Sequence, residues 1–386
     1  MIPYGKQNIS KSDIIAVEKV LKSDFITQGP IVPKFEKKIS EIVGSKFAFA
    51  SNSATSSLHT ACLALGLGKG DYLWTSPNSF VASSNCALYC GAKVDFVDIE
   101  AKSFNMDMGL LKKKLEVAKK NKTLPKIIVP VHMAGQSCDM KTLKELSNKY
   151  NFKIIEDASH CIGAKYKGKN VGSCLYSDIA VFSFHPVKII TTGEGGVATT
   201  NDAGIAKKLN ILRTHGVTKN HNEMVSVSHG QWYFEQIDLG YNYRMTDLHA
   251  ALGLNQLKRL KSFVSKRNKI AKKYDFLLKD LPLRTPKCFK DSYSSFHLYI
   301  IRINLDDLNI SKNIIFNYLR KKGIGVNVHY IPIHYHPFYQ NLNFKKGDFP
   351  QTELYYKEAM SLPIFPDLKS EDQKYVVNSL KEILLK

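Results

Sequence analysis

Cysteine is scarce and unpaired in this sequence, and several other features of exported proteins are missing. The seven cysteines include no CxxC pair, which argues against a disulfide framework and a zinc ribbon. The opening stretch MIPYGKQNISKSD lacks the apolar core of a secretory signal, and no apolar run is long enough to cross a bilayer. The sequence therefore predicts a globular cytoplasmic protein with reduced thiols and no membrane partner.

Acidic residues are few relative to basic ones. The sequence has 34 Asp and Glu and 55 Lys and Arg, which gives a formal net charge of +21. Such a charge is compatible with nucleic acid, anionic lipid or a phosphorylated small molecule as partner. The densest basic run, residues 257–281, has apolar residues at helical spacing, which predicts a helix whose lysines face solvent. No nucleic-acid-binding motif accompanies the charge, so we expect no nucleic-acid partner.

Seven short apolar runs alternate with amphipathic segments between residues 45 and 200. Their continuous apolar character is typical of strands that are covered on both faces, with helices as crossovers. This pattern predicts a mainly parallel, doubly wound α/β sheet, whose ligands lie beyond the carboxyl ends of the strands. The predicted strands are 46–51, 71–77, 93–99, 126–133, 152–159, 178–185 and 195–200.

The pattern changes after a long predicted helix at residues 245–280. Residues 296–304 alternate like a half-exposed strand, 311–325 resemble a helix that ends at Gly323, and 326–330 are predicted as another strand. We therefore expect two domains, a large one at residues 1–255 and a smaller C-terminal α/β domain at residues 256–386.

Small polar residues open a predicted helix directly after the first strand, in SNSATSSLHTA. They would direct backbone N–H groups and hydroxyls toward an anion, assisted by the helix dipole. An ordinary Ser/Thr N-cap has the same pattern, so this motif alone does not decide between the two.

Two acids, Glu156 and Asp157, end another predicted strand in IIEDASH. An acid in this place often only caps the following turn. An ionised carboxylate beside an aromatic heterocycle would instead keep a ring nitrogen protonated. At ~4 Å and an effective dielectric constant near 20, that pairing contributes about 4 kcal/mol, which corresponds to roughly three pKa units.

A lysine, Lys188, follows a further predicted strand in FSFHPVKIITTGEGG. Lysines are common at wet strand ends, but a desolvated lysine becomes a nucleophile that forms a Schiff base with an aldehyde. An anion site, a carboxylate and a lysine are together what pyridoxal 5'-phosphate needs as anchor, ring partner and tether. We therefore predict this cofactor.

The same motifs are similar, nearly end to end, to those of the DegT/DnrJ/StrS-type nucleotide-sugar aminotransferases. This resemblance implies a fold-type I pyridoxal-phosphate transferase that forms a homodimer with shared active sites. The motifs that carry it are FITQGP, SNSATSSL, SPNSFVASSNCALYCGAKVDFVDI, EDASH, FSFHPVKIITTGEGG, LRTHG, LGYNYRMTDLHAALGLNQL and VHYIPIHYHPFY.

The resemblance implies roles for individual residues. Lys188 would be the Schiff-base lysine and proton carrier, and Asp157 would pair with the pyridine nitrogen. The other implied cofactor contacts are His160 at the ring hydroxyl, Phe80 on the ring face, Ala54, Thr55 and Ser183 at the phosphate, and Asn242 at the phosphate of the neighbouring subunit. His185 and Glu194 lie in the same motifs, where a structural role in the turn is an alternative.

Four further residues are predicted to address the nucleotide sugar: Arg213, Arg244, His329 and Tyr330. His329, His334 and His336 also resemble a metal-binding group. Interleaved prolines and aromatic residues make that hypothesis weak, so we expect no metal.

The resemblance also implies a reaction, in which L-glutamate donates its amino group and leaves as 2-oxoglutarate. Within the family, the motifs are most similar to aminotransferases of pseudaminic acid synthesis, which implies a UDP-linked 4-keto-6-deoxy-N-acetylhexosamine as acceptor. The alternatives are a UDP-bacillosamine precursor or a dTDP-4-keto-6-deoxy sugar. Family dehydratases carry histidine in place of Lys188, and a regulatory protein on this fold would not need the complete set of cofactor residues.

Overall fold

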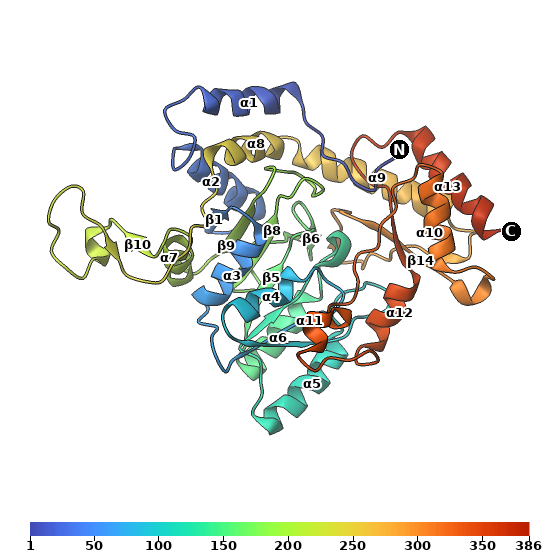
Figure 1. The fold of residues 1–386 in the computed structure, drawn as a ribbon, viewed down its shortest axis with the longest axis horizontal. Helices are drawn as coiled ribbons and strands as arrows, with labels where there is room; N and C mark the ends of the chain where they lie inside the picture. The colour runs from blue at the N-terminus through green and yellow to red at the C-terminus, as the bar shows by residue number, and fades with distance from the viewer. Residues whose placement is uncertain (386) are drawn as a thin grey trace.

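The computed structural model describes residues 1–385, and a seven-stranded sheet forms its centre (Figure 1). The strand order is β1-β9-β8-β5-β4-β2-β3; six of the seven strands run in one direction, whereas β9 is antiparallel to both of its neighbours. Each strand lies within one of the predicted apolar runs, so the predicted α/β fold class is confirmed. The strands are β1 (Phe47–Ser51), β2 (Tyr72–Thr75), β3 (Lys93–Phe96), β4 (Ile127–Val129), β5 (Lys153–Asp157), β8 (Ile179–Ser183) and β9 (Gly196–Thr200).

Helices cover both faces of this sheet because successive strand residues point to opposite sides. In β2, for example, Leu73 belongs to the apolar core under α3, α4 and α7, whereas Trp74 belongs to the core under α5 and α6. Helices α2 and α8 cover the β8–β9 end of the second face. These helices are α2 (Ile31–Val43), α3 (Ala54–Ala64), α4 (Ala82–Tyr89), α5 (Met108–Asn121), α6 (Met140–Tyr150), α7 (Ala203–Leu212) and α8 (Asp247–Leu257).

The prediction of one long helix at residues 245–280 is wrong in one respect, because the segment forms two helices. Helix α8 ends at Leu257, and α9 (Leu260–Leu277) starts after Lys258 and Arg259. The Arg259 guanidinium forms a hydrogen-bonded ion pair with Asp13 of α1 (Lys11–Leu21). No proline or glycine marks this break, so the reason is a tertiary one. The apolar stripe of α9 is buried as predicted, and most of its lysines are exposed.

A second, three-stranded antiparallel sheet lies in the C-terminal part, with the order β12-β14-β15. The prediction of a half-exposed strand is wrong, because all five residues of β14 are buried between two neighbouring strands and the surrounding helices. The predicted helix at 311–325 is confirmed, and Gly323 follows it with a φ of 76°. These elements are β12 (Leu283–Arg284), β14 (Tyr299–Ile303), β15 (Ala359–Leu362), α10 (Lys312–Lys321) and α13 (Ser370–Leu384).

Residues 326–330 do not form the predicted strand. Only Asn327 pairs, in an isolated bridge with Ser361 of β15, and the segment then turns toward the central sheet. The residual elements are short: β6 (Lys165–Tyr166), β7 (Lys169–Asn170), β10 (Val217–Thr218), β11 (Glu235–Gln236), β13 (Ser292–Tyr293), α11 (Pro337–Gln340) and α12 (Pro350–Glu358). The β10–β11 hairpin and its loop project from the body as an arm (Figure 1).

The division into domains at residue 255 stays a prediction. The first residues lie beside the C-terminal part, since the Ile2 N–H donates to the Gly323 carbonyl at 2.8 Å and the Ile2 carbonyl accepts from Gly325 at 2.7 Å (Figure 1). Across the part of the chain that the structure describes, no helix combines the length and apolar character that a bilayer crossing requires.

Candidate active site

A cavity of about 510 Å³ lies where β5 and β8 present their polar carboxyl ends. Asp157 is the last residue of β5 and Ser183 the last of β8, so the sheet itself aims both into the cavity. This is the sheet edge at which doubly wound folds bind ligands. The cavity brings together most of the predicted site residues: Ala54, Thr55, Phe80, Asp157, His160, Ser183, Lys188, His329 and Tyr330.

Lys188 lies in the loop that returns from β8 to β9. A tight turn holds it, with the Lys188 N–H donating to the His185 carbonyl at 2.9 Å. The loop closes where the Thr192 N–H donates to the Phe184 carbonyl at 3.0 Å. Burial lowers the pKa of Lys188 to about 8, although the nearby Asp157 carboxylate acts in the opposite direction. The amine is therefore available as a nucleophile near neutral pH.

Asp157 is oriented by two neutral donors. The Ser83 hydroxyl donates to Oδ2 at 2.6 Å, and the Ser159 N–H donates to Oδ1 at 3.1 Å. Neither donor carries a charge. The carboxyl group lines the cavity, where it can hold a cationic ring nitrogen.

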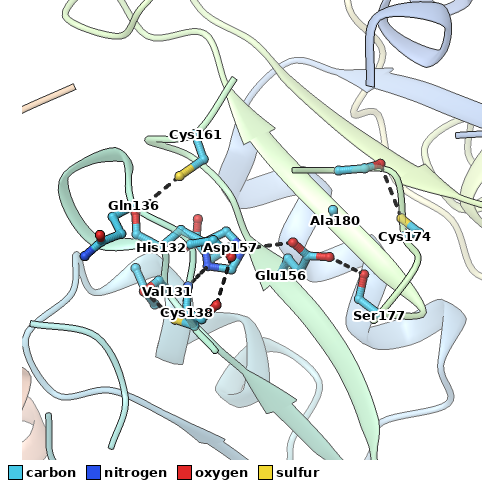
Figure 2. Close-up of polar contacts among 12 residues, drawn as sticks. Val131, His132, Gln136, Cys138, Glu156, Asp157, Cys161, Cys174, Ser177 and Ala180 are labelled. Carbon is cyan, nitrogen blue, oxygen red and sulfur yellow. Dashed lines mark hydrogen bonds and ion pairs between the residues drawn. The ribbon is translucent and has the colours of Figure 1, made fainter. Parts of the chain in front are cut away.

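Glu156, the other acid of the motif, points to the opposite face of β5 (Figure 2). It is buried and accepts hydrogen bonds from the Ser177 hydroxyl and from His132 Nε2, the latter at 2.8 Å. The Cys138 N–H donates to His132 Nδ1 at 3.2 Å, so the ring proton lies on Nε2. The structure thus assigns Glu156 to packing and Asp157 to the cavity.

The N-terminus of α3 also lines the cavity. Ser53 is an ordinary N-cap, because its hydroxyl accepts from the Ser56 N–H at 3.1 Å. The N–H groups of Ala54 and Thr55 belong to the first turn, which has no acceptors inside the helix. Gly196 permits this arrangement, since a Cβ there would lie 2.5 Å from the Ala54 nitrogen. The cap and the anion site proposed from the sequence therefore coexist in one helix end.

The opposite wall is aromatic and electrically neutral. His160 Nε2 lies 3.3 Å from the Tyr330 hydroxyl, and its ring is 4.4 Å from that of His297. Burial and the nearby Lys188 place the pKa of His160 well below its usual value and that of His329 at about 3. The imidazoles are thus neutral at physiological pH, and they act as hydrogen-bonding groups.

Three predicted site residues lie outside this cavity. Arg213 binds Glu36 and donates to the Ala50 carbonyl at 2.6 Å, which is a packing role within the chain. Asn242 is exposed and pairs with Thr214, and Arg244 pairs with Ser51. Their contacts with cofactor or sugar stay predictions.

The cavity also holds residues that the sequence analysis missed: Tyr4, Ser83, His297 and Asn327. Ser83 lies in the motif SPNSFVASSNCALYC, three residues after Phe80. Its closeness to Phe80 in the sequence could have identified it as a site residue. Tyr4 and His297 come from distant parts of the chain, and no local pattern marks them. The suspected histidine metal group is not formed, because His334 Nε2 contacts Glu353 at 2.9 Å. No metal-ligand group of three or more His, Cys, Asp or Glu is found within residues 1–385.

The donor set fits pyridoxal 5'-phosphate. An amine with a lowered pKa lies near the Asp157 carboxyl group, and a helix N-terminus offers free N–H groups to a phosphate. Phe80 lines the cavity and is 58 % exposed, and its ring lies 6.0 Å from the Tyr330 ring, so it can present a face to a planar ligand. Fold and site together define a pyridoxal-phosphate enzyme of the aminotransferase type.

The chain belongs to the DegT/DnrJ/EryC1/StrS aminotransferase family, whose model matches residues 7–381. It is 40% identical over 388 residues to the UDP-4-amino-4,6-dideoxy-N-acetyl-β-L-altrosamine transaminase of Campylobacter jejuni, covering 100% of this chain and 98% of that protein. The predicted family and the aminotransferase class are thereby confirmed.

Solved structures agree with this assignment. Helicobacter pylori PseC, an aminotransferase of pseudaminic acid biosynthesis, superimposes with a TM-score of 0.91 at 32% identity, over 100% of this chain and 99% of that one. The PLP form of the sugar aminotransferase Spr1654 of Streptococcus pneumoniae has a TM-score of 0.88 at 29% identity, over 100% and 98% of the two chains. The dependence of the family on pyridoxal 5'-phosphate agrees with the predicted cofactor.

Proposed function

We propose that this protein transfers the amino group of L-glutamate to the C4 keto group of a UDP-linked 4-keto-6-deoxy-N-acetylhexosamine, a step of pseudaminic acid synthesis. The names of two relatives support this substrate: the C. jejuni transaminase and PseC of H. pylori. The alternatives within the family are a UDP-bacillosamine precursor and a dTDP-4-keto-6-deoxy sugar.

One observation carries the proposal: Lys188 and Asp157 share a cavity at the end of the sheet. When bound there, pyridoxal 5'-phosphate supplies an aldehyde and a ring that stabilises a carbanion. Lys188 would hold the cofactor and move a proton on and off the reacting carbon, which its lowered pKa favours near neutral pH. Asp157 would keep the ring nitrogen charged, and its bonds to Ser83 and Ser159 fix its direction.

The other wall of the cavity would position the ligands. Phe80 would cover one ring face, His160 would lie at the ring hydroxyl, and Ser183 with the first N–H groups of α3 would bind the phosphate. His329 and Tyr330 would contact the sugar. Because family dehydratases carry histidine where Lys188 stands, the presence of Lys188 favours transamination over dehydration.

A homodimer in the cytoplasm is part of the proposal. Asn242 is exposed and lies outside the cavity of its own chain, as is expected for a residue that serves the neighbouring subunit. The β10–β11 arm exposes Val225, Val227 and Trp232, with Trp232 76 % exposed. Large exposed apolar side chains on one arm are typical of an association surface.

A substrate panel tests the proposal. Purified protein loaded with cofactor is offered UDP- and dTDP-linked 4-keto sugars with L-glutamate, and formation of 2-oxoglutarate is measured. We expect turnover of the L-arabino-configured UDP-N-acetyl keto sugar. Reaction with dTDP sugars only would refute the pseudaminate assignment, and absence of turnover with every keto sugar would refute the aminotransferase itself. Sedimentation of the same sample tests the homodimer.

A further inference from the structure

The two helices that enter the cavity also carry a cluster of thiols on their later turns. Two sets of residues share a helix face by their i, i+3/i+4 and i+7 spacing: Thr55, His59 and Cys62 on α3, and Ser83, Cys86 and Cys90 on and just after α4. The first member of each set lines the cavity. Cys62 and Cys86 are fully buried in one apolar core, and Cys90 packs against that core while remaining partly exposed.

His59 supplies a polar group inside this cluster. Its ring lies 4.8 Å from the Tyr241 ring and 5.5 Å from the Tyr89 ring, and it is only 4% exposed. Nδ1 lies 3.2 Å from the Tyr243 hydroxyl, which can accept the Nδ1 proton and leave Nε2 as an acceptor for the proton of the Cys90 thiol. Within the described residues, Nε2 has no hydrogen-bond partner that meets normal geometry. A buried, unused ring nitrogen of this kind points to a function.

The thiols of this cluster differ in character. The Cys62 side chain and the His59 imidazole lower the pKa of Cys90 to about 6, although burial opposes the shift. Burial and the neighbouring Cys86 and Cys90 raise the pKa of Cys62 well above its usual value. Cys90 is therefore the nucleophile of the cluster, with a neutral thiol beside it.

We propose that Cys90 is a peroxide-reactive thiol, that His59 carries its proton, and that Cys62 resolves the oxidised form as a disulfide between α3 and just after α4. This site is independent of the aminotransferase reaction. Its partner is a small hydroperoxide, which can reach Cys90 because that residue is partly exposed.

The proposed chemistry balances in two steps. The Cys90 sulfur attacks one peroxide oxygen, an S–O bond forms and the O–O bond breaks; His59 gives its proton to the leaving oxygen, which departs as water or alcohol. Sulfur loses two electrons and the peroxide gains them. The Cys62 sulfur then attacks the Cys90 sulfur, the S–S bond forms, and the S–O oxygen leaves as water with the proton of the Cys62 thiol.

Thiol reactivity tests the first step. Full-length protein is treated with iodoacetamide between pH 5 and pH 10, and the labelled peptides are quantified. We expect Cys90 to react with a midpoint near pH 6, and more than about tenfold faster at pH 7 than Cys288, the pKa of which desolvation and Asp275 raise to about 11. His59→Gln should shift the Cys90 midpoint upward toward ~8.5. A Cys90 midpoint at 8.5 in the unmodified protein, or one that His59→Gln leaves in place, would overturn the proposal.

Peptide mapping after peroxide tests the second step. Stoichiometric hydrogen peroxide should produce a peptide pair linked through Cys62 and Cys90, lighter by two hydrogens and restored by a reducing agent. Cys288→Ser is the matched control and should give the same link, whereas Cys90→Ser should abolish it. Mapping of the unmodified chain avoids any folding defect of a variant. A stable sulfenic acid on Cys90 without the link, or a link through other cysteines, would refute the assignment to Cys62.

Discussion

The two faces of strand β5 carry neighbouring acids that have opposite environments. Each acid accepts two hydrogen bonds, but Glu156 is enclosed with Ser177 and His132 on one face of β5 (Figure 2). Asp157 accepts from Ser83 and Ser159 and lines the cavity that Lys188 also lines. A buried carboxylate that faces no cavity stabilises the fold through its hydrogen bonds, because leaving it unpaired would be costly. A carboxylate that lines a cavity beside an amine is available for chemistry. The difference lies in the neighbours and not in the residue type.

Removing the amine on the cavity side should have the largest effect. We expect Lys188→Ala to lower kcat by about 10³-fold or more, because both the tether and the proton carrier are lost. Single-turnover kinetics with L-glutamate measure this loss. If the variant still formed a borohydride-reducible adduct with the cofactor at the same site, the assignment of Lys188 would fail.

Exchanging each acid for its amide compares the two faces directly. Asp157→Asn should lower kcat/KM by about 10²- to 10³-fold, because a pairing of about 4 kcal/mol with the ring nitrogen is lost, with little change in Tm. Glu156→Gln should lower the free energy of unfolding by about 1–3 kcal/mol, because the hydrogen bond from His132 is weakened, and leave kcat within about twofold. Equal losses of activity in both variants would contradict the assignment of Asp157 to the reaction and of Glu156 to the stability of the fold.

The serine partners of the two acids should repeat this contrast on a smaller scale. Ser83→Ala removes the donor to Asp157 and should lower kcat about fivefold, which corresponds to a hydrogen bond of about 1 kcal/mol. Ser177→Ala removes the donor to Glu156 and should lower stability by about the same energy without changing kcat. Urea unfolding and steady-state kinetics on both variants separate the two outcomes. A Ser177→Ala variant with the larger kinetic defect would contradict the comparison.

The smallest expected effect is a shift in the pH dependence of the reactivity of the Lys188 amine, which also distinguishes the two acids of β5. Only the neutral amine attacks an aldehyde, so the rate of borohydride-trapped labelling in cofactor-free protein should rise with pH through a midpoint near 8 and level off at higher pH. The Asp157 carboxylate raises the pKa of this amine, so Asp157→Asn should move the midpoint to lower pH. Glu156→Gln, on the other face, should leave the midpoint unchanged. A midpoint near 10.5 would show that the amine is fully solvated.

Much of this architecture could be predicted from local pattern. Each strand of the central sheet is a continuous apolar run, and polar residues at strand ends must converge at one edge of a parallel sheet. Lys188 and the acid pair Glu156 and Asp157 follow from that rule, whereas the family resemblance singled out Asp157 and added Ser183. The family resemblance added Phe80 and His160, which no periodicity identifies.

The sequence predictions that were wrong or incomplete have a common physical cause, which is tertiary contact. The break after α8 coincides with the bond between Arg259 and Asp13, which lie far apart in the sequence. The segment 326–330 has strand-like residues, but its only backbone pairing is the isolated bridge between Asn327 and Ser361, so no ladder forms. His297 and Tyr4 enter the cavity through the packing of the C-terminal part and the first residues, and neither event leaves a local signal.

The position of the first residues has a practical consequence for handling the protein. Ile2 is hydrogen-bonded on both sides and Tyr4 is already in the cavity wall. A purification tag fused ahead of Met1 would lie a few residues from the cavity wall, whereas α13 contributes nothing to that wall. Affinity handles and surface-immobilisation linkers therefore belong at the carboxyl end, and kinetic data from amino-terminally tagged preparations should be compared with protein from which the tag has been cleaved.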